Sequence, residues 1–369
     1  MVTKKNERKI VLQQVLDPRG SGGVSAEFRA LNNSKLKEKY LFVPMILENF
    51  HKGLNIKDIY FYYKQINAAK PDIVQIRGAA IDSLNAVIAA KLANKAKILV
   101  CVHGMYSDLV FISKFKKNLS KFVVEPLIFS ISDGISCVYE RASLRDNFSR
   151  YTKKMLPYVY NRIPDFSIYD RLKYRQEIRE DLGIPNQNHV GVLCGRITRE
   201  KGFHILVKTI QNLDFDWPVD FSILILGDGN YLQTLKEEIS KLKNCKSIFI
   251  VGNKTEVFKY LFASDFFIQP SLHENLSISL LEASAAKLPM IATNVGGTSE
   301  IITNNQNGLL ICKNDSKSLN DAILKMINDK EFYNFCLKNI SKSNFDRFSD
   351  VEVDKQLESV YSKIMRENK

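Results

Sequence analysis

The sequence predicts an α/β protein with two doubly wound domains, each built on a parallel sheet. In both halves of the chain, short apolar runs alternate with helical stretches, which is the pattern of parallel strands joined by helical crossovers. Several of these runs end in Gly-containing turns, as strands commonly do in such folds. The 369 residues, 45% of them hydrophobic, can bury two cores of ordinary size. We therefore expect one domain over residues 1–165, a second over 166–345, and a final helix within 346–369.

The first domain begins with an apolar run at 10–16, followed by a turn that contains Gly22 and Gly23. A Gly-rich turn between a strand and a helix lets the backbone approach a ligand closely. Any tight turn of this kind could have the same composition, and the turn fits neither the Gly-x-Gly-x-x-Gly nor the Walker pattern. Taken alone, the turn is a weak indication of a ligand.

Residues 71–102 predict a strand, an Ala-rich helix and a second strand. Ligands of a parallel sheet gather at the carboxyl ends of its strands. His103 directly follows the second of these strands, whereas Gln75 and Arg77 lie at the tip of the first. An isolated histidine in this position is also compatible with a purely structural role.

Aromatic and basic residues interleave between residues 111 and 122. On a helix, Phe111, Phe115, Leu119 and Phe122 would share one face, with lysines beside it. This pattern fits a patch on a membrane surface and also fits ordinary core packing. Of the two interpretations we prefer core packing, with the lysines in water.

The second domain begins with a strand at 190–194, and the loop that follows runs from Gly195 to Gly202. Arg196 and Lys201 lie five residues apart in this loop, just before a predicted helix. A guanidinium fork, an ammonium group and a helix start together suit a diphosphate, although a charged loop of this kind can also be plain surface.

The stretch from 273 to 282 is the most informative of the chain, and it follows a short strand that ends before Pro270. Ser277 is a good N-cap, and the helix start behind it offers free N–H groups and a positive dipole end to a phosphate. Glu274 lies in the loop and Glu282 in the helix, so we expect them to contact different parts of one elongated ligand. Apolar neighbours of Glu282 are an unfavourable setting for an unpaired charge.

Residues 271–300, with Glu274 and Glu282 in a Glu-x7-Glu pattern, resemble the signature of the family-4 retaining glycosyltransferases of the GT-B fold, which make bacterial polysaccharides and other glycans. The resemblance covers most of the chain. It implies two facing domains with the active cleft between them, and a last helix that crosses back to pack on the first domain. Lys287 stands where many members have Gly, which predicts a non-Gly residue in a left-handed helix cap.

The resemblance also implies roles for individual residues. Glu282 would bind the ribose of the donor, and Glu274 with the main chain after it would bind the sugar and the phosphates. The residues expected to perform the reaction are His103, Arg196, Lys201 and Glu274. Those expected to bind the nucleotide sugar are Gly22, Gly23, Gly195, Gly227, Asn253, Asn275, Leu276, Ser277 and Glu282.

No metal or cofactor is expected. Asp214 and Asp216 form an Asp-x-Asp pattern, but they lie in a predicted turn between a helix and a strand, away from a strand tip. We therefore interpret them as a solvated turn. Cationic side chains and a helix dipole can neutralise a leaving diphosphate instead.

The net charge of +13 is confined to the first half of the chain. Residues 1–165 carry 27 Lys and Arg against 14 Asp and Glu, whereas residues 166–369 carry 26 of each. This excess indicates an anionic partner such as a membrane surface, or else a solvated lysine-rich face. The chain has no apolar run of 18 residues, its six cysteines form no close pairs, and no nucleic-acid module is recognisable. We expect a cytoplasmic protein, peripheral at the inner face of the membrane.

The predicted function is retaining transfer of a hexosyl unit from a nucleoside-diphosphate sugar, with UDP the expected nucleotide. The expected acceptor is a hydroxyl of a glycan or lipid-linked molecule in cell-surface polysaccharide synthesis. Two alternatives remain open. A nucleotide-sugar epimerase shares the fold and needs no acceptor, and a non-catalytic anion-binding protein is supported by charge alone.

Overall fold

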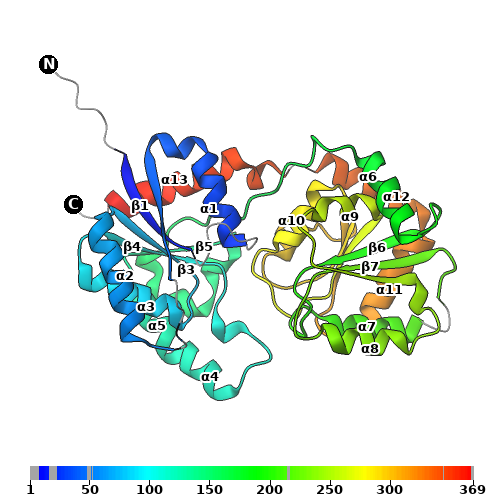
Figure 1. Cartoon of the computed structure of the whole chain (residues 1–369), viewed down its shortest axis with the longest axis horizontal. Coiled ribbons are helices and arrows are strands. Elements are labelled where there is room, and N and C mark those ends of the chain that lie inside the picture. Colours follow the sequence, from blue (N-terminus) through cyan, green and yellow to red (C-terminus); the bar gives the residue numbers. More distant parts are fainter. Residues whose placement is uncertain are drawn as a thin grey trace. The chain divides into compact units, whose positions relative to one another are not determined.

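The computed structural model divides the chain into two units, Met1–Arg162 with Asp346–Lys369, and Ile163–Phe345 (Figure 1). It describes residues 8–15, 23–47, 51, 53–213, 217–343 and 345–366, without the side chains of residues 23–26. Each unit is a parallel sheet with helices packed on it, so the predicted α/β class with two doubly wound sheets is confirmed. Gly22 and the Asp-x-Asp turn at 214–216 lie outside the described residues.

The sheet of the first unit has the strand order β2-β1-β3-β4-β5, and all described pairings are parallel. Its strands are β1 (Lys9–Gln14), β2 (Tyr40–Met45), β3 (Ile73–Arg77), β4 (Lys97–Val102) and β5 (Gly134–Cys137). The order reverses between β1 and β3. At such a reversal the connections leave to opposite faces, which opens a crevice at the carboxyl ends of the two strands.

The helices of the first unit follow the predicted alternation with the strands. They are α1 (Gly23–Asn33), α2 (Ile56–Ala69), α3 (Ile81–Ala93), α4 (Lys114–Leu119) and α5 (Glu125–Ile131), with short helical turns η1 (Lys35–Glu38), η2 (Tyr106–Asp108), η3 (Ser120–Val124), η4 (Glu140–Leu144) and η5 (Asp146–Lys154). Asn55 caps α2 by accepting from two backbone N–H groups of its first turn. The helix ends at Lys70 in the left-handed conformation, with φ 43°. Both ends of α2 are therefore defined by local chemistry.

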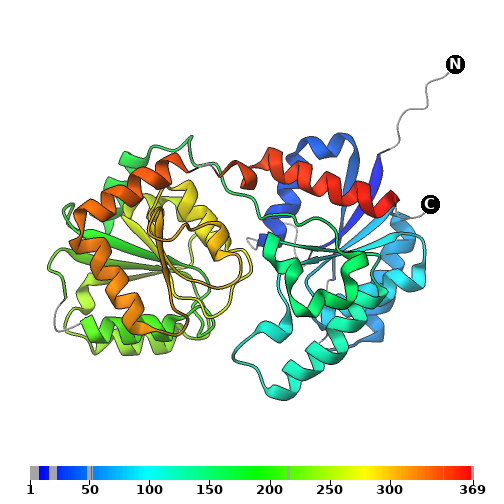
Figure 2. The ribbon, with the colours of Figure 1, turned by 180° about the vertical axis from the view of Figure 1, so that it is seen from behind.

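The last helix, α13 (Asp350–Arg366), packs on the first unit, as Figure 2 shows for the red helix. It follows the turn η8 (Asp346–Phe348), and Ser349 Oγ accepts from the N–H of Glu352 at 3.4 Å, as expected for a capping residue. Tyr361 of this helix is fully buried and donates its hydroxyl to Gln75 Oε1 at 2.5 Å. The end of the chain thus completes the core of the first unit.

The six strands described in the second unit are all parallel, in the order β11-β10-β9-β6-β7-β8. They are β6 (His189–Cys194), β7 (Phe221–Leu226), β8 (Ile248–Gly252), β9 (Phe266–Gln269), β10 (Met290–Thr293) and β11 (Gly308–Ile311). The order reverses between β6 and β9, so the loops after these two strands flank the crevice of this sheet.

Seven helices cover the second sheet in the described part of the chain. They are α6 (Arg171–Leu182), α7 (Phe203–Leu213), α8 (Leu232–Ser240), α9 (Val257–Ala263), α10 (Ile278–Ala285), α11 (Ser316–Asn328) and α12 (Lys330–Lys342), with turns η6 (Cys245–Ser247) and η7 (Thr298–Glu300). The only tryptophan of the sequence, Trp217, stacks on Phe221 with ring centroids 5.2 Å apart and donates to the Phe221 carbonyl at 3.0 Å. Its fluorescence therefore reports on the folding of the second unit.

The aromatic stripe between residues 111 and 122 does not pack in a core. Phe115 is 75% exposed and Phe122 is 67% exposed, and Phe111 and Leu119 are also exposed. The preferred interpretation of core packing is therefore wrong. It assumed one regular helix over this stretch, whereas α4 spans only Lys114–Leu119 and is followed by the π-helical turn η3. None of the helices in the described residues is long and apolar enough to span a membrane.

Candidate active site

An ion pair joins the two loops that flank the crevice of the second sheet. Lys201 Nζ, after β6, lies 2.6 Å from Glu274 Oε1, after β9. Ser271 Oγ donates to the same carboxylate oxygen at 2.8 Å. The carboxylate is buried, so its charge is balanced by the ammonium group rather than by water. Two residues predicted for the donor site are thereby brought together at the carboxyl edge.

Backbone contact holds these two loops in place. Gly202 has φ +79°, and a Cβ on this residue would lie 1.9 Å from the carbonyl oxygen of Pro270. Next to it, the N–H of Leu272 donates to the carbonyl of Glu200 at 2.9 Å. Only glycine allows this approach, so Gly202 is required for Lys201 to reach Glu274.

The loop after β7 supports the loop after β6 in the same way. A Cβ on Gly227 would lie 1.8 Å from the carbonyl oxygen of Gly195. On Gly195 itself, a Cβ would meet no atom within 4 Å, so this glycine borders open space where a ligand can approach the backbone. Arg196 is exposed and has no hydrogen bond or ion pair among the described residues. Of the two cations predicted to bind the diphosphate, Lys201 is paired with the carboxylate of Glu274 and Arg196 projects into solvent.

The start of α10 has the predicted cap. Ser277 Oγ accepts from the N–H of Leu280 at 3.3 Å and donates to Gln269 Oε1 at 2.6 Å. The other N–H groups of the first turn have no helical acceptor, and together with the helix dipole they favour an anion. The sequence analysis did not predict Gln269 and Ser271 as site residues. Both are polar residues at the carboxyl end of a buried strand, and that position could have indicated them.

A second Gly-containing loop supports the chain around Glu274. A Cβ on Gly296 would lie 2.1 Å from the carbonyl oxygen of Glu274, and the N–H of Gly297 donates to the carbonyl of Asn275 at 2.6 Å. The loop after β10 therefore positions the predicted donor-binding main chain at Asn275, Leu276 and Ser277. Asn253, which follows β8, is exposed.

Glu282 lies on the same edge as Lys201. Burial raises the pKa of Glu282 to about 7. At the end of β6, burial raises the pKa of the Cys194 thiol to about 12, with the nearby Glu282 raising it further and Lys201 lowering it. Both side chains therefore lie near the end of β6. Lys287, just past α10, has φ 57°, which confirms the predicted left-handed cap.

In the first unit, His103 and Arg77 meet at the carboxyl ends of β4 and β3. Arg77 Nη1 lies 3.2 Å from His103 Nε2, and Arg77 Nη2 donates to Gln13 Oε1 at 3.3 Å. Burial, and then the charge of Arg77, lower the pKa of His103 to about 3. The imidazole is therefore neutral, with Nε2 as acceptor and the proton on Nδ1. Arg77 orients the histidine, a role that the sequence did not indicate. Gly23, predicted near this edge, is the first residue of α1.

Within the described residues, no three His, Cys, Asp or Glu side chains are grouped so that they could hold a metal ion. The Lys201–Glu274 pair, the start of α10 and Glu282 are grouped at one edge of the second unit, whereas Arg77 and His103 belong to the edge of the first. The absence of a metal requirement stays a prediction.

The second unit is similar in sequence to a family of known proteins. Residues 174–343 match the family described as glycosyl transferases group 1. The matched residues make up most of the second unit, Ile163–Phe345. The Lys201–Glu274 pair and the capped helix α10 lie within the matched residues.

Similarity to individual proteins extends over most of the chain. The chain is 27% identical over 326 residues to an Escherichia coli protein named UDP-Gal:alpha-D-GlcNAc-diphosphoundecaprenol alpha-1,3-galactosyltransferase, covering 87% of this chain and 82% of that one. It is 23% identical over 299 residues to the N-acetyl-alpha-D-glucosaminyl L-malate synthase of Bacillus anthracis, covering 81% and 76%. The crystal structure of Anabaena HepE with UDP and glucose has the same fold, with a TM-score of 0.78, 16% identity and coverage of 96% and 100%.

Proposed function

We propose that this protein is a retaining glycosyltransferase that moves a hexosyl unit from a UDP-sugar to a hydroxyl of a glycan or lipid-linked acceptor. The observation that carries the proposal is the Lys201–Glu274 pair at the capped start of α10, inside the residues that match the group 1 glycosyl transferases. The names of two similar proteins support UDP as the nucleotide, and one of them is named for action on a diphosphoundecaprenol-linked sugar.

The proposed chemistry is an exchange of partners at the edge of the second sheet. When a diphosphate arrives, the ammonium group of Lys201 turns from the Glu274 carboxylate to the phosphate oxygens, and the N–H groups at the start of α10 share the negative charge. The released carboxylate of Glu274 then accepts hydrogen bonds from sugar hydroxyls, and Glu282 binds the ribose. The bond from the anomeric carbon to the phosphate oxygen breaks as the acceptor oxygen bonds to the same face of that carbon, and the leaving phosphate takes the proton of the acceptor hydroxyl. Attack on the same face gives retention, and in this proposal no metal is needed.

The test is a panel of UDP-sugars with a lipid-linked acceptor, with the anomeric configuration of the product determined by NMR. We expect one donor to give an α-linked product from an α-configured donor, with the activity unchanged by EDTA. Lys201→Ala should reduce the rate by about 100-fold or more, since a charge opposite the developing diphosphate is lost. An altered sugar formed from donor alone would establish the epimerase instead, and an inverted product would refute retention.

We also propose that the protein acts at an anionic membrane through the α4 surface, defined as the exposed side chains Phe111, Phe115, Leu119 and Phe122 with the neighbouring lysines. Exposed rings cost free energy in water that insertion among lipid headgroups recovers. The lysines at 114, 116, 117 and 121 add attraction to anionic lipids. Both features occur in one short segment of the basic half of the chain.

Sedimentation with phosphatidylglycerol vesicles tests this surface. We expect Phe115→Ser/Phe122→Ser to weaken vesicle binding about tenfold or more, because two inserted rings are removed. The matched control is Leu172→Ser/Val219→Ser, which removes two apolar side chains of the second unit that are at least as exposed, and it should have no effect. Equal binding of all three proteins, or binding that ignores the anionic lipid content, would refute the membrane proposal.

A further inference from the structure

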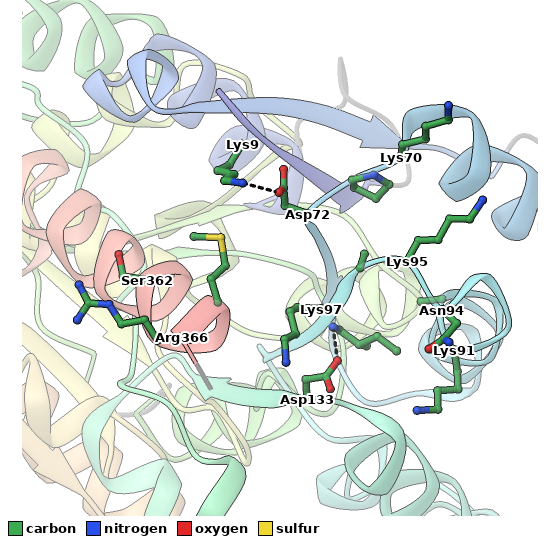
Figure 3. A pocket seen from close by; sticks show the side chains of 15 residues that line it. Lys9, Lys70, Asp72, Lys91, Asn94, Lys95, Lys97, Asp133, Ser362 and Arg366 are labelled. Carbon is green, nitrogen blue, oxygen red and sulfur yellow. Dashed lines mark hydrogen bonds and ion pairs between the residues drawn. The ribbon is translucent and has the colours of Figure 1, made fainter. Parts of the chain in front are cut away.

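A basic groove lies at the amino ends of the strands of the first sheet, at the edge opposite to His103. We define the basic groove by its charged lining residues, Lys9, Lys70, Asp72, Lys91, Lys95, Lys97, Asp133 and Arg366 (Figure 3). Its volume is about 940 Å³, which is within the size range of sites for small organic ligands. Since ligands of a parallel sheet bind at the carboxyl ends, the transfer reaction does not account for this groove.

Both carboxylates of the groove have structural partners. Asp72 accepts from Lys9 Nζ at 3.0 Å and from the N–H of Ile10 at 2.8 Å. Asp133 accepts from the N–H of Ile98 at 2.8 Å. Each aspartate thereby anchors the beginning of a strand. Five lysines and Arg366 share the lining with these two aspartates, so the lining residues carry an excess of four positive charges.

The cations come from segments that are far apart in the sequence. Lys70 ends α2, Lys91 lies in the last turn of α3, and Lys97 begins β4. Figure 3 shows the lysines around the hollow, whereas Arg366 on α13 points away from them. Part of the charge complements helix C-termini, which favour cations. The ammonium groups of Lys70 and Lys91, however, have no ion pair or hydrogen bond to any residue that the structure describes, and both residues are exposed.

The spacing of the lysines indicates an extended anion. Lys9 on β1 and Lys97 on β4 are separated by two steps across the sheet, which is roughly 10 Å at the usual strand spacing. One phosphate cannot contact ammonium groups at both positions, but a chain of linked phosphates can. Ammonium groups are hydrated point charges without a fixed fork, so they recognise charge density rather than one geometry.

The composition of the lining separates three classes of anion. None of the lining residues is aromatic, so the groove has no ring on which a nucleic-acid base could stack. It also lacks the exposed rings that the α4 surface offers to lipid, and it is concave rather than flat. A soluble anion with several phosphates needs neither an aromatic ring to stack on nor a flat surface with exposed rings, so it fits this lining.

We propose that the basic groove binds a soluble anion with several linked phosphate groups, at a site separate from the donor site. The site accounts for part of the positive charge that distinguishes residues 1–165 from the rest of the chain. Bound there, the ligand would contact β1, β4 and the ends of α2 and α3, and would neutralise charges that now repel one another.

The test is calorimetric titration of the full chain with inorganic tripolyphosphate in the presence of saturating UDP. The variant is Lys70→Asn/Lys91→Gln, in which Asn tolerates the left-handed conformation at position 70, so that charge is removed and the fold is kept. The matched control is Lys330→Gln/Lys338→Gln on α12, which removes two exposed charges from the second unit.

We expect saturable binding of tripolyphosphate to the full chain in the presence of UDP. The affinity should fall about tenfold or more in the groove variant, and it should also fall as the ionic strength rises, since the site is electrostatic. The control should change affinity by about twofold or less, because it removes only distant, screened charges. Equal weakening by both variants, displacement of tripolyphosphate by UDP, or no saturable binding would overturn the proposal. So would a groove variant that loses binding to phosphatidylglycerol vesicles while its tripolyphosphate affinity is unchanged.

Discussion

Replacing Lys201 by Met leaves the carboxylate of Glu274 without its ammonium partner. The side chain of Glu274 is 9% exposed and that of Lys201 is 26% exposed, so the pair is mostly shielded from water. Breaking a wholly buried pair costs about 3–5 kcal/mol, whereas an exposed pair contributes at most about 1 kcal/mol. Between these limits, we expect Lys201→Met to lower the free energy of unfolding of the second unit by about 1–3 kcal/mol.

The second variant of the cycle, Glu274→Gln, removes the charge and retains an oxygen that can accept from Ser271. The double variant should therefore be more stable than Lys201→Met alone, because no buried carboxylate is left unpaired. We expect a coupling free energy of about 1–2 kcal/mol. Lys236→Met, at an exposed lysine of α8, is the matched control and should cost less than about 0.5 kcal/mol.

Urea unfolding followed by the fluorescence of Trp217 measures these free energies. Trp217 is the sole tryptophan and packs in the second unit, so unfolding of the first unit does not contribute to the signal. If Lys201→Met costs no more than the control, or if the two single changes are additive, the ion pair does not stabilise the loops and our account of the site is wrong.

Three further perturbations test other parts of the structure. Because burial raises the pKa of Glu282 to about 7, the folded state keeps a proton that the unfolded chain has already lost, so stability should fall as the pH rises from about 4.5 to 7. Glu282→Gln should remove about 1–3 kcal/mol of this pH dependence in the Trp217 unfolding assay, and an unchanged profile would contradict the assignment. Gly202→Ala should lower the unfolding free energy by about 3 kcal/mol or more, since its Cβ would collide with Pro270. The control Gly183→Ala, at φ +67° with open space around the Cβ position, should cost only about 1 kcal/mol. Similar costs for the two variants would refute the close approach of Gly202 to Pro270. Arg77→Met should raise the pKa of His103 from about 3, but not to the value of an exposed histidine, because the charge of Arg77 is lost while the burial of His103 remains. NMR titration of the imidazole measures this pKa. An unchanged pKa would exclude the Arg77 contact.

Local chemistry made much of the architecture predictable from the sequence. Strands buried on both faces appear as apolar runs, and crossovers appear as helical stretches between them, so the two parallel sheets followed from a pattern that neighbouring residues define. The cap at Ser277 was predictable for the same reason, because it depends on atoms within a few residues of the position. The left-handed cap at Lys287 followed instead from the family resemblance, in which many members have Gly at this position.

Contacts between distant segments could not be predicted in this way. Lys201 and Glu274 are 73 residues apart, and their pairing depends on β6 lying next to β9. The orientation of His103 depends likewise on β3 lying next to β4, which brings Arg77 to the imidazole. Sequence patterns show that strands exist but not which of them are neighbours.

The sequence by itself determined the two parallel sheets, the candidate site residues and the basic excess of the first half. Only the tertiary structure decided where that excess charge and the aromatic stripe lie. It placed Lys70, Lys91 and Lys97 around one hollow and left Phe115 and Phe122 exposed. The physical reason is that burial and charge density are properties of the folded chain as a whole, whereas periodicity and capping are properties of a few consecutive residues.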